Sequence, residues 1–195
     1  TTGSVEVQSG GTFGAGSSIG ALDVNGDLTF AEGSTFEIET DETGRADKVA
    51  VTGSVDIQGG TALVVGEGLN YAPELSMEIL SAQSGIAGRF SDITSTLAFL
   101  DADLAYGENG VTLDLERNDT AFDTVSDTAN GRSAAAGVES LGFGHEVYNA
   151  VVMLEAESAS TSFNNLSGEL YAASAGALAE QSATIGHVAG IQFEK

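Results

Sequence analysis

The chain of 195 residues contains no cysteine and no tryptophan, and Pro73 is its single proline. Without cysteine, neither disulfides nor thiolate metal sites are available, so packing and backbone hydrogen bonds must hold the fold together. Rigid aromatic anchors are few, whereas 26 glycines supply many points at which the backbone can turn. These features favour a turn-rich β architecture.

Positive charge is scarce as well. Six Lys and Arg residues stand against 29 Asp and Glu residues, which gives a net charge of -23 at pH 7. Such a charge repels phosphate backbones and anionic membrane surfaces, so nucleic acid is excluded as a partner. No apolar segment reaches the roughly 20 residues needed to span a bilayer, and no signal peptide is visible. A hydrophobic content of 42% is enough for a sizeable core.

Three stretches of the sequence superimpose without a gap. Gly3, Gly26 and Gly53 each open a unit with apolar residues two and four places on, a second glycine at seven and an apolar residue at ten. The matching positions are Val5/Val7/Gly10/Phe13, Leu28/Phe30/Gly33/Phe36 and Val55/Ile57/Gly60/Leu63. Units of this size cannot bury their own apolar faces, so they predict coils stacked along an axis over residues 1–70.

Each full coil is expected to hold three short strands. Alternation with period two places one set of side chains inward and acidic residues outward. The expected inward pairs are Leu22/Val24, Leu28/Phe30 and Phe36/Ile38, then Val49/Val51, Val55/Ile57 and Leu63/Val65. The polar segment from Thr40 to Lys48 is expected to bulge from the stack as a loop.

Beyond residue 70 the glycine spacing ends, and residues 71–117 are expected to form a β cap. Alternating segments at 104–106 and 111–115 flank Gly107-Glu-Asn-Gly110, where Asn109-Gly110 would supply the positive φ of a tight hairpin turn. Residues 118–195 change to apolar residues at helical spacing. Helices are expected over about 133–157, interrupted at Gly142 and Gly144, and over about 160–181.

The order of these segments resembles a known family. The residues that carry the resemblance are the glycine-rich repeats, Tyr71-Ala-Pro73, Ile79-Leu80-Ser-Ala, Gly88-Arg-Phe90-Ser91, Leu104-Ala-Tyr106-Gly107, Val111-Thr-Leu113-Asp-Leu115 and Leu166-Ser-Gly-Glu169-Leu-Tyr-Ala172. Together they resemble the end of a bacterial autotransporter (type V secretion) passenger, pertactin-like or AIDA-like, followed by its linker. The resemblance implies an all-β right-handed parallel β-helix with a C-terminal hairpin cap, followed by an α-helical linker.

The same resemblance implies a function. Residues 71–117 would act as an autochaperone-like cap that nucleates folding of the β-helix and supports display on the cell surface or secretion from a Gram-negative bacterium. The implied partners are upstream passenger coils and the protein's own outer-membrane β-barrel, toward which residues 118–195 would lead. Two alternatives remain: an adhesin that binds host surface molecules through the 40–48 loop, and a hydrolase built on the β-helix.

Two motifs suggest catalysis. Gly16-Ser17-Ser18-Ile19-Gly20 matches the G-x-S-x-G pattern, but no α/β pattern surrounds Ser18, so a turn is the preferred interpretation. His145 and His187 both lie in the helical tail and are interpreted as surface or packing residues. The sequence therefore predicts no catalytic residues and a protein that is not an enzyme.

Two further motifs suggest a metal site and self-cleavage. Asp23-Val-Asn25-Gly-Asp27 begins like a calcium loop, but Leu28 stands where that loop needs glycine. Outward carboxylates at a β-turn are the preferred interpretation, so neither a metal site nor a cofactor site is predicted. Asn164-Asn165 could release a passenger by asparagine chemistry, and an ordinary helix position is preferred.

Overall fold

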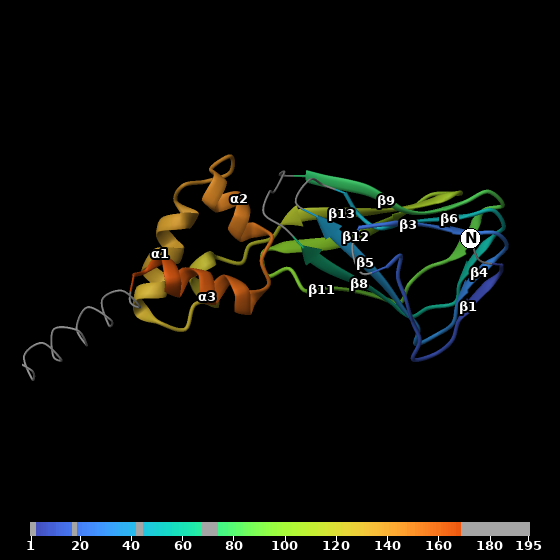
Figure 1. Cartoon of the computed structure of the whole chain (residues 1–195), viewed down its shortest axis with the longest axis horizontal. Coiled ribbons are helices and arrows are strands. Elements are labelled where there is room, and N and C mark those ends of the chain that lie inside the picture. The colour runs from blue at the N-terminus through green and yellow to red at the C-terminus, as the bar shows by residue number, and fades with distance from the viewer. Residues whose placement is uncertain (1–2, 17–18, 42–44, 68–73, 169–195) are drawn as a thin grey trace, which may run out of the picture.

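The computed structural model describes residues 3–16, 19–41, 45–67 and 74–168. In these residues the strands β1 to β13 come first and four helices follow. Figure 1 shows the helices gathered at one end of the molecule's long axis, with the strands filling the rest. The described chain is thus mostly β, with helices confined to residues after Arg117.

Three sheets make up the β part. The first has the order β1 (Val5–Val7), β4 (Leu28–Phe30), β7 (Val55–Ile57) and β10 (Ile86–Gly88). The second has the order β11 (Asp92–Ser95), β8 (Thr61–Glu67), β5 (Thr35–Asp41) and β2 (Thr12–Phe13). The third has the order β12 (Leu100–Tyr106), β13 (Gly110–Arg117), β9 (Glu74–Ala82), β6 (Lys48–Val51) and β3 (Ala21–Val24).

Strand pairing follows the sequence repeat. Val5 lies opposite Leu28, and Leu28 lies opposite Val55, all in parallel strands. Parallel pairing continues past residue 70, because β9 pairs with β6, β10 with β7 and β11 with β8. From β1 to β11, strands that succeed one another in the chain therefore belong to different sheets, and each repeat adds one strand to each sheet. This arrangement is compatible with a parallel β-helix.

The repeat fills the interior with apolar side chains. Leu28 and Phe30 are fully buried, as are Phe36 and Ile38. Phe30 contacts Phe36 and Phe90, with ring centroids 5.3 and 5.1 Å apart, so aromatic rings from separate repeats pack against one another inside the β part. Leu22 on the edge strand β3 is only partly buried.

In β8, the face that points into the core is the opposite of the predicted one. In β8 the buried residues are Ala62 and Val64, and the expected pair Leu63 and Val65 lies on the other face. Phe36 pairs with Ala62 because the turn from β7 to β8 is one residue shorter than the turn from β4 to β5. Gly59 and Gly60, with φ of 130° and 85°, form this tighter turn. A slip of one residue reverses every side chain of a strand.

The predicted hairpin is present, but its turn differs. β12 and β13 pair antiparallel, and the Gly107 N–H donates to the Gly110 carbonyl at 2.8 Å. Neither Asn109 nor Gly110 has a positive φ, so that part of the prediction is wrong. The turn is held from outside instead: the Ala82 N–H donates to the Asn109 carbonyl, and the Asn109 amide donates to the Ala82 carbonyl.

Helices follow the hairpin. They are the 3-10 helix η1 (Phe122–Val125) and the α-helices α1 (Ala129–Glu139), α2 (Glu146–Val152) and α3 (Ala156–Leu166). The expected interruption at Gly142 and Gly144 falls between α1 and α2. Residues 169–181, expected to continue the last helix, lie outside the described residues. Whether residues 118–195 serve as a linker stays a prediction.

Candidate functional site

The junction between the hairpin and the helices is built from aromatic side chains. Phe122, the first residue of η1, is fully buried and lies 4.6 Å from the Phe99 ring, centroid to centroid. Its ring also contacts Tyr148 of α2 at 5.1 Å and Phe163 of α3 at 6.0 Å. One side chain thus joins the residue that precedes β12 to two helices.

Arg117, at the end of β13, reinforces this junction. Its guanidinium donates to the Phe99 carbonyl at 3.2 Å and to the Thr120 carbonyl at 2.7 Å. The same group lies 5.1 Å from the Phe122 ring centroid and pairs with Glu139 of α1 at 3.3 Å. Glu139 in turn accepts the Phe122 N–H at 3.2 Å. A planar cation with several donors suits such a position, because it satisfies carbonyls and a carboxylate at once.

The sequence interpretation did not single out Arg117 or Phe122. Arg117 could have been noticed, since it is one of only six basic residues and directly follows the alternating strand. Phe122 carried no such signal, because one aromatic residue in a polar stretch has no periodic neighbours.

A polar clasp joins α1 to α3. Thr128 caps α1 by accepting the Gly131 N–H at 2.9 Å, and its hydroxyl donates to Asn164 Oδ1 at 2.7 Å. The Asn164 amide donates to Asp127 Oδ1 at 3.1 Å, and the Ser160 hydroxyl donates to the same oxygen at 3.4 Å. Asn164 therefore has a structural role, because both its amide oxygen and its amide nitrogen form hydrogen bonds in the clasp. The prediction of an ordinary helix position at Asn164-Asn165 agrees with this placement in α3.

Gly131→Ala should open the clasp. Gly131 is buried, and a Cβ there would collide with Asn164 Oδ1, Ser126 Oγ and Thr128 Oγ1. Overpacking of this kind costs about 1–3 kcal/mol. Gly137→Ala is the matched control in the same helix, because a Cβ there meets nothing within 4 Å. The control should raise stability by about 0.5–1 kcal/mol. Urea unfolding of both variants measures the difference, and equal effects would refute the clasp.

The clasp should also be sensitive to acid. The hydrogen bond from Asn164 is the main cause that holds the pKa of Asp127 below its ordinary value. A carboxyl with a lowered folded-state pKa adds stability that is complete above the unfolded-state pKa, about 3.9, and is lost as the pH falls through the folded value. The free energy of unfolding should therefore fall more steeply below about pH 4 for the wild type than for Asp127→Asn. Parallel profiles of the two proteins, measured in urea, would contradict this prediction.

The calcium-like segment has a structural role in the stack. Asp27 Oδ1 accepts the Ser54 N–H at 2.8 Å and the Ser54 hydroxyl at 2.9 Å, and the Asp27 N–H donates to Ser4 Oγ at 3.0 Å. The hydrogen bonds from Ser54 lower the pKa of Asp27. Equivalent turns of three repeats are thus tied together on the outside of the stack. Within the described ranges, no group of three or more His, Cys, Asp or Glu side chains could hold a metal ion.

The residues of the catalytic motif are not brought together. Ser17 and Ser18 lie outside the described residues, as does His187. His145 is exposed, and its Nδ1 accepts the Val147 N–H at 3.3 Å at the start of α2. The prediction of no catalytic residues stays a prediction.

Hydrogen bonds and a β-bridge fix the two ends of the expected 40–48 loop. Asp47 is buried and accepts the Gly20 N–H at 2.8 Å and the Glu39 N–H at 3.2 Å. Thr40 and Ala46 form an antiparallel bridge. The adhesin alternative expects receptor contacts from the whole 40–48 loop, and residues 42–44 of this loop lie outside the described residues. In the part of the chain that is described, no helix is long and apolar enough to cross a membrane.

Comparison with known proteins gives two relatives. Both are named extracellular serine protease and come from Serratia marcescens. One is 31% identical over 150 residues, covering 72% of this chain and 14% of the relative. The other is 30% identical over 143 residues, covering 65% of this chain and 13% of the relative. The chain therefore spans a small part of the length of these relatives. No family model matches it.

These relatives correct one prediction. The sequence interpretation favoured a protein that is not an enzyme, on the ground that no catalytic pattern was visible. That prediction is wrong, because both similar proteins are named serine proteases and point to an enzyme.

Proposed function

We propose that this chain is the C-terminal part of a right-handed β-helix in an autotransporter passenger, together with the first helices of its linker. The observation that carries the proposal is the asymmetry of the stack. On one side the third sheet is extended by the antiparallel hairpin β12–β13 beyond the level at which β10 and β11 end the other two sheets, whereas on the other side β1, β2 and β3 end the three sheets without such a hairpin. Similarity to secreted serine proteases supports a passenger-associated role outside a Gram-negative cell.

Upstream coils of the same protein are the proposed partners of the open side. Parallel edge strands present unpaired N–H and C=O groups that accept another strand. Val5 and Val7 already lie in register with Leu28 and Phe30, so a further repeat with the same spacing would extend all three sheets. On this proposal the parent protein is a secreted serine protease, and this chain is its terminal β scaffold.

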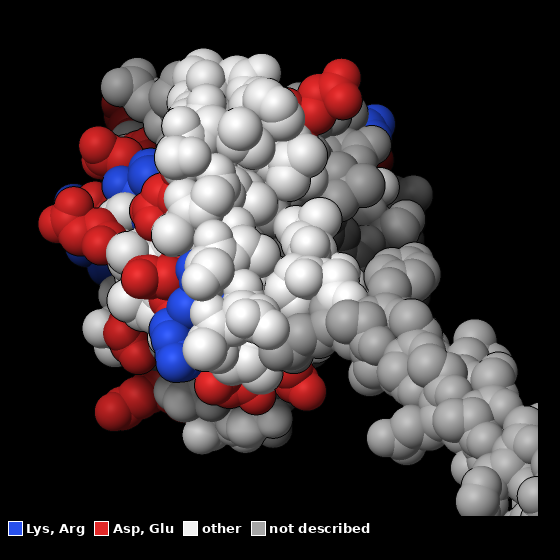
Figure 2. Space-filling view, turned by 90° about the vertical axis from the view of Figure 1, so that its left-hand side faces the viewer, with Lys and Arg blue, Asp and Glu red and all other residues white. Residues whose placement is uncertain are grey.

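The helical end is proposed to face the outer-membrane β-barrel of the same protein. Figure 2 shows a broad face of this end without charged side chains, while Asp and Glu gather along its side. For a chain with a net charge of -23, such a face is unusual. Leu141, Phe143 and Leu166 are each about half exposed, at 46%, 56% and 55%. Val147, Leu154 and Leu166 also line an apolar groove of about 460 Å³ between α2 and α3.

Nucleation of folding is proposed for the hairpin and the junction. β13 lies between β9 and β12, and its Val111, Leu113 and Leu115 are fully buried. Contacts between β12 and β13 are local in sequence, so forming them costs little loop entropy compared with pairing strands one repeat apart. Once formed, this unit presents β9 as an edge on which β6 can pair.

The proposal can be tested in the parent protein on whole cells. Leu113→Asp places an unpaired charge in the core of the hairpin and should strongly reduce the amount of folded passenger that antibodies detect at the cell surface. Asp114→Asn, on the opposite face of the same strand, is the control and should leave the amount unchanged. Normal display of the Leu113→Asp protein would show that this unit does not support secretion.

A further inference from the structure

Three asparagines of the chain, Asn25, Asn109 and Asn130, directly precede a glycine. An asparagine in this position can modify itself. The backbone nitrogen of the glycine loses its proton to solvent and bonds to the side-chain carbonyl carbon (Cγ) of the asparagine, the bond from Cγ to the amide nitrogen breaks, and ammonia leaves. Water then opens the resulting five-membered ring to aspartate or to isoaspartate, in which the backbone runs through the former side chain. Glycine favours the attack because it has no Cβ to obstruct the approach.

The fold restrains two of these three asparagines. The Asn109 amide donates to the Ala82 carbonyl at 2.7 Å, and the Asn109 carbonyl accepts the Ala82 N–H at 2.9 Å. Asn130 lies in the first turn of α1, where the Gly131 N–H already donates to Thr128 Oγ1 at 2.9 Å. A helical side chain also tilts toward the N-terminus of its helix, away from the nitrogen of the next residue. Both arrangements keep Cγ from reaching the glycine nitrogen.

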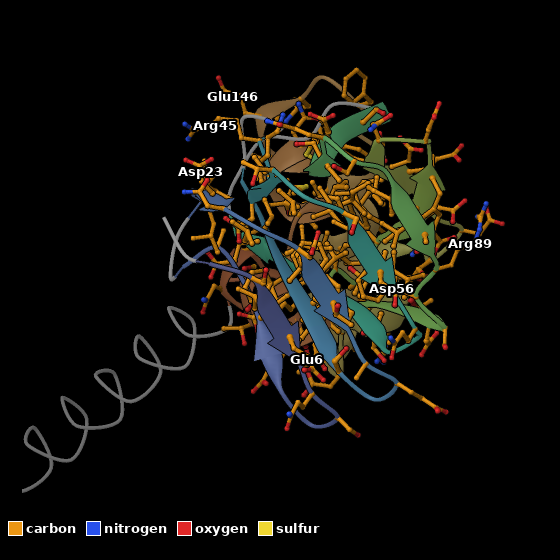
Figure 3. The ribbon with its side chains drawn as sticks, turned by 90° about the vertical axis from the view of Figure 1, so that its right-hand side faces the viewer. Glu6, Asp23, Arg45, Asp56, Arg89 and Glu146 are labelled. Atoms are coloured by element: carbon orange, nitrogen blue, oxygen red, sulfur yellow. The ribbon has the colours of Figure 1, made fainter. Side chains whose placement is uncertain are left out.

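Asn25 is not restrained in this way. It lies in the turn between β3 and β4 and is exposed, and its side chain has no hydrogen-bond partner among the residues that the structure describes. Asn25 lines an open polar pocket of about 390 Å³ together with Asp23, Thr52 and Gln83. Figure 3 shows Asp23, two residues before Asn25, at the outer edge of the ribbon. The Asn25 side chain can therefore rotate toward the Gly26 nitrogen, and water can reach the ring that forms.

The fold requires the glycine of this pair but not the asparagine. Gly26 has a φ of 152°, and a Cβ there would collide with Ser4 Oγ and lie 2.7 Å from the Ser4 nitrogen. In the next repeat, Thr52 precedes the equivalent Gly53, so the turn does not need an amide side chain at this position. Threonine has no amide group to lose. The turn at Asn25 is thus reactive, and the equivalent turn at Thr52 is not.

We propose that Asn25-Gly26 is a self-modification site, at which the folded protein forms isoaspartate while Asn109 and Asn130 stay intact. The only co-reactant is water. The proposal does not depend on the role in secretion, because the reaction needs only the exposed turn and the solvent.

The modification has a structural consequence for the stack. Isoaspartate lengthens the backbone by one methylene two residues before Asp27. The Asp27 N–H donates to Ser4 Oγ at 3.0 Å, the Asp27 carbonyl accepts the Val5 N–H at 2.8 Å, and its carboxylate accepts the Ser54 N–H. These hydrogen bonds join three repeats at this turn, and β4 is the one strand paired with β1. Isoaspartate at position 25 therefore loosens β1 from the stack.

Peptide mapping tests the site on the full chain. The protein is incubated at mildly alkaline pH, digested, and analysed by chromatography with mass spectrometry, which separates isoaspartate from aspartate. Asn25 should be converted at least about tenfold faster than Asn109 and Asn130, because reaction depends on bringing Cγ onto the glycine nitrogen. In guanidinium chloride the three rates should converge, since unfolding releases the restrained sites. Equal rates in the folded protein, or an Asn25 that stays intact while the unfolded chain reacts, would overturn the proposal.

Two variants separate the longer backbone from the added charge. Asn25→Thr copies the equivalent Thr52, so it should fold normally and show no modification at position 25. Asn25→Asp adds the same negative charge as the reaction but keeps the ordinary backbone. Hydrogen exchange of the β1 amides should be about tenfold faster or more in the modified protein and unchanged in Asn25→Asp. Equal acceleration in Asn25→Asp, or none in the modified protein, would contradict the loosening of β1.

Discussion

Phe122→Ala should lower the free energy of unfolding by about 3–5 kcal/mol, the cost of removing a fully buried aromatic ring from a core. The loss should be at the upper part of this range because Phe122 contacts Phe99, Tyr148 and Phe163, and no one neighbour can fill the space alone. Arg117 would also lose its cation–π contact with the Phe122 ring. Chemical denaturation followed by circular dichroism measures the change.

Phe143→Ala is the control for the same chemical change. Its ring is 56% exposed between α1 and α2, so the expected effect is within about 0.5 kcal/mol. A loss in Phe122→Ala as small as in the control would mean that the helices are not coupled to the hairpin. A loss confined to helical signal, with the strands unaffected, would also contradict a shared core.

Leu113→Ala should lower stability by about 2–5 kcal/mol and slow refolding by about tenfold or more. Leu113 is fully buried in β13, inside the unit proposed to form first. Leu28→Ala in β4 is the matched substitution, also fully buried, and lies in a repeat proposed to form later. It should cost a similar amount of stability, but mainly by speeding unfolding.

Stopped-flow refolding separates these effects. If both substitutions slow refolding equally, the hairpin has no priority over the repeats. If Leu28→Ala slows it more, folding begins at the open side, and the proposed direction is reversed.

The repeats could be predicted from the sequence because the spacing of their glycines and apolar residues reflects which side chains are buried. Glycine at the turns and alternating apolar residues correctly indicated which strands pair, such as Val24 with Val51. The face of β8 could not be predicted from the same alignment. The turn before β8 is one residue shorter than the corresponding turn before β5, a difference that the spacing of glycines and apolar residues does not reveal. This difference places Ala62 on the inward face and Leu63 on the outward face.

The turn and the junction depend on contacts distant in sequence. Asn109-Gly110 is a common signal for a positive-φ turn, but hydrogen bonds to Ala82 across the sheet favour another geometry. The role of Arg117 follows from Glu139 and Phe122, which the chain brings to it only after folding. Local patterns could not show either, because the partners lie in different elements.

Pulsed hydrogen exchange with mass spectrometry during refolding of the full chain tests the central claim most directly. Amides of β9, β12 and β13 should become protected first, those of β6 to β8 next, and those of β1 to β3 last. Protection that starts at β1 to β3, or that rises everywhere at the same rate, would contradict folding from the capped side.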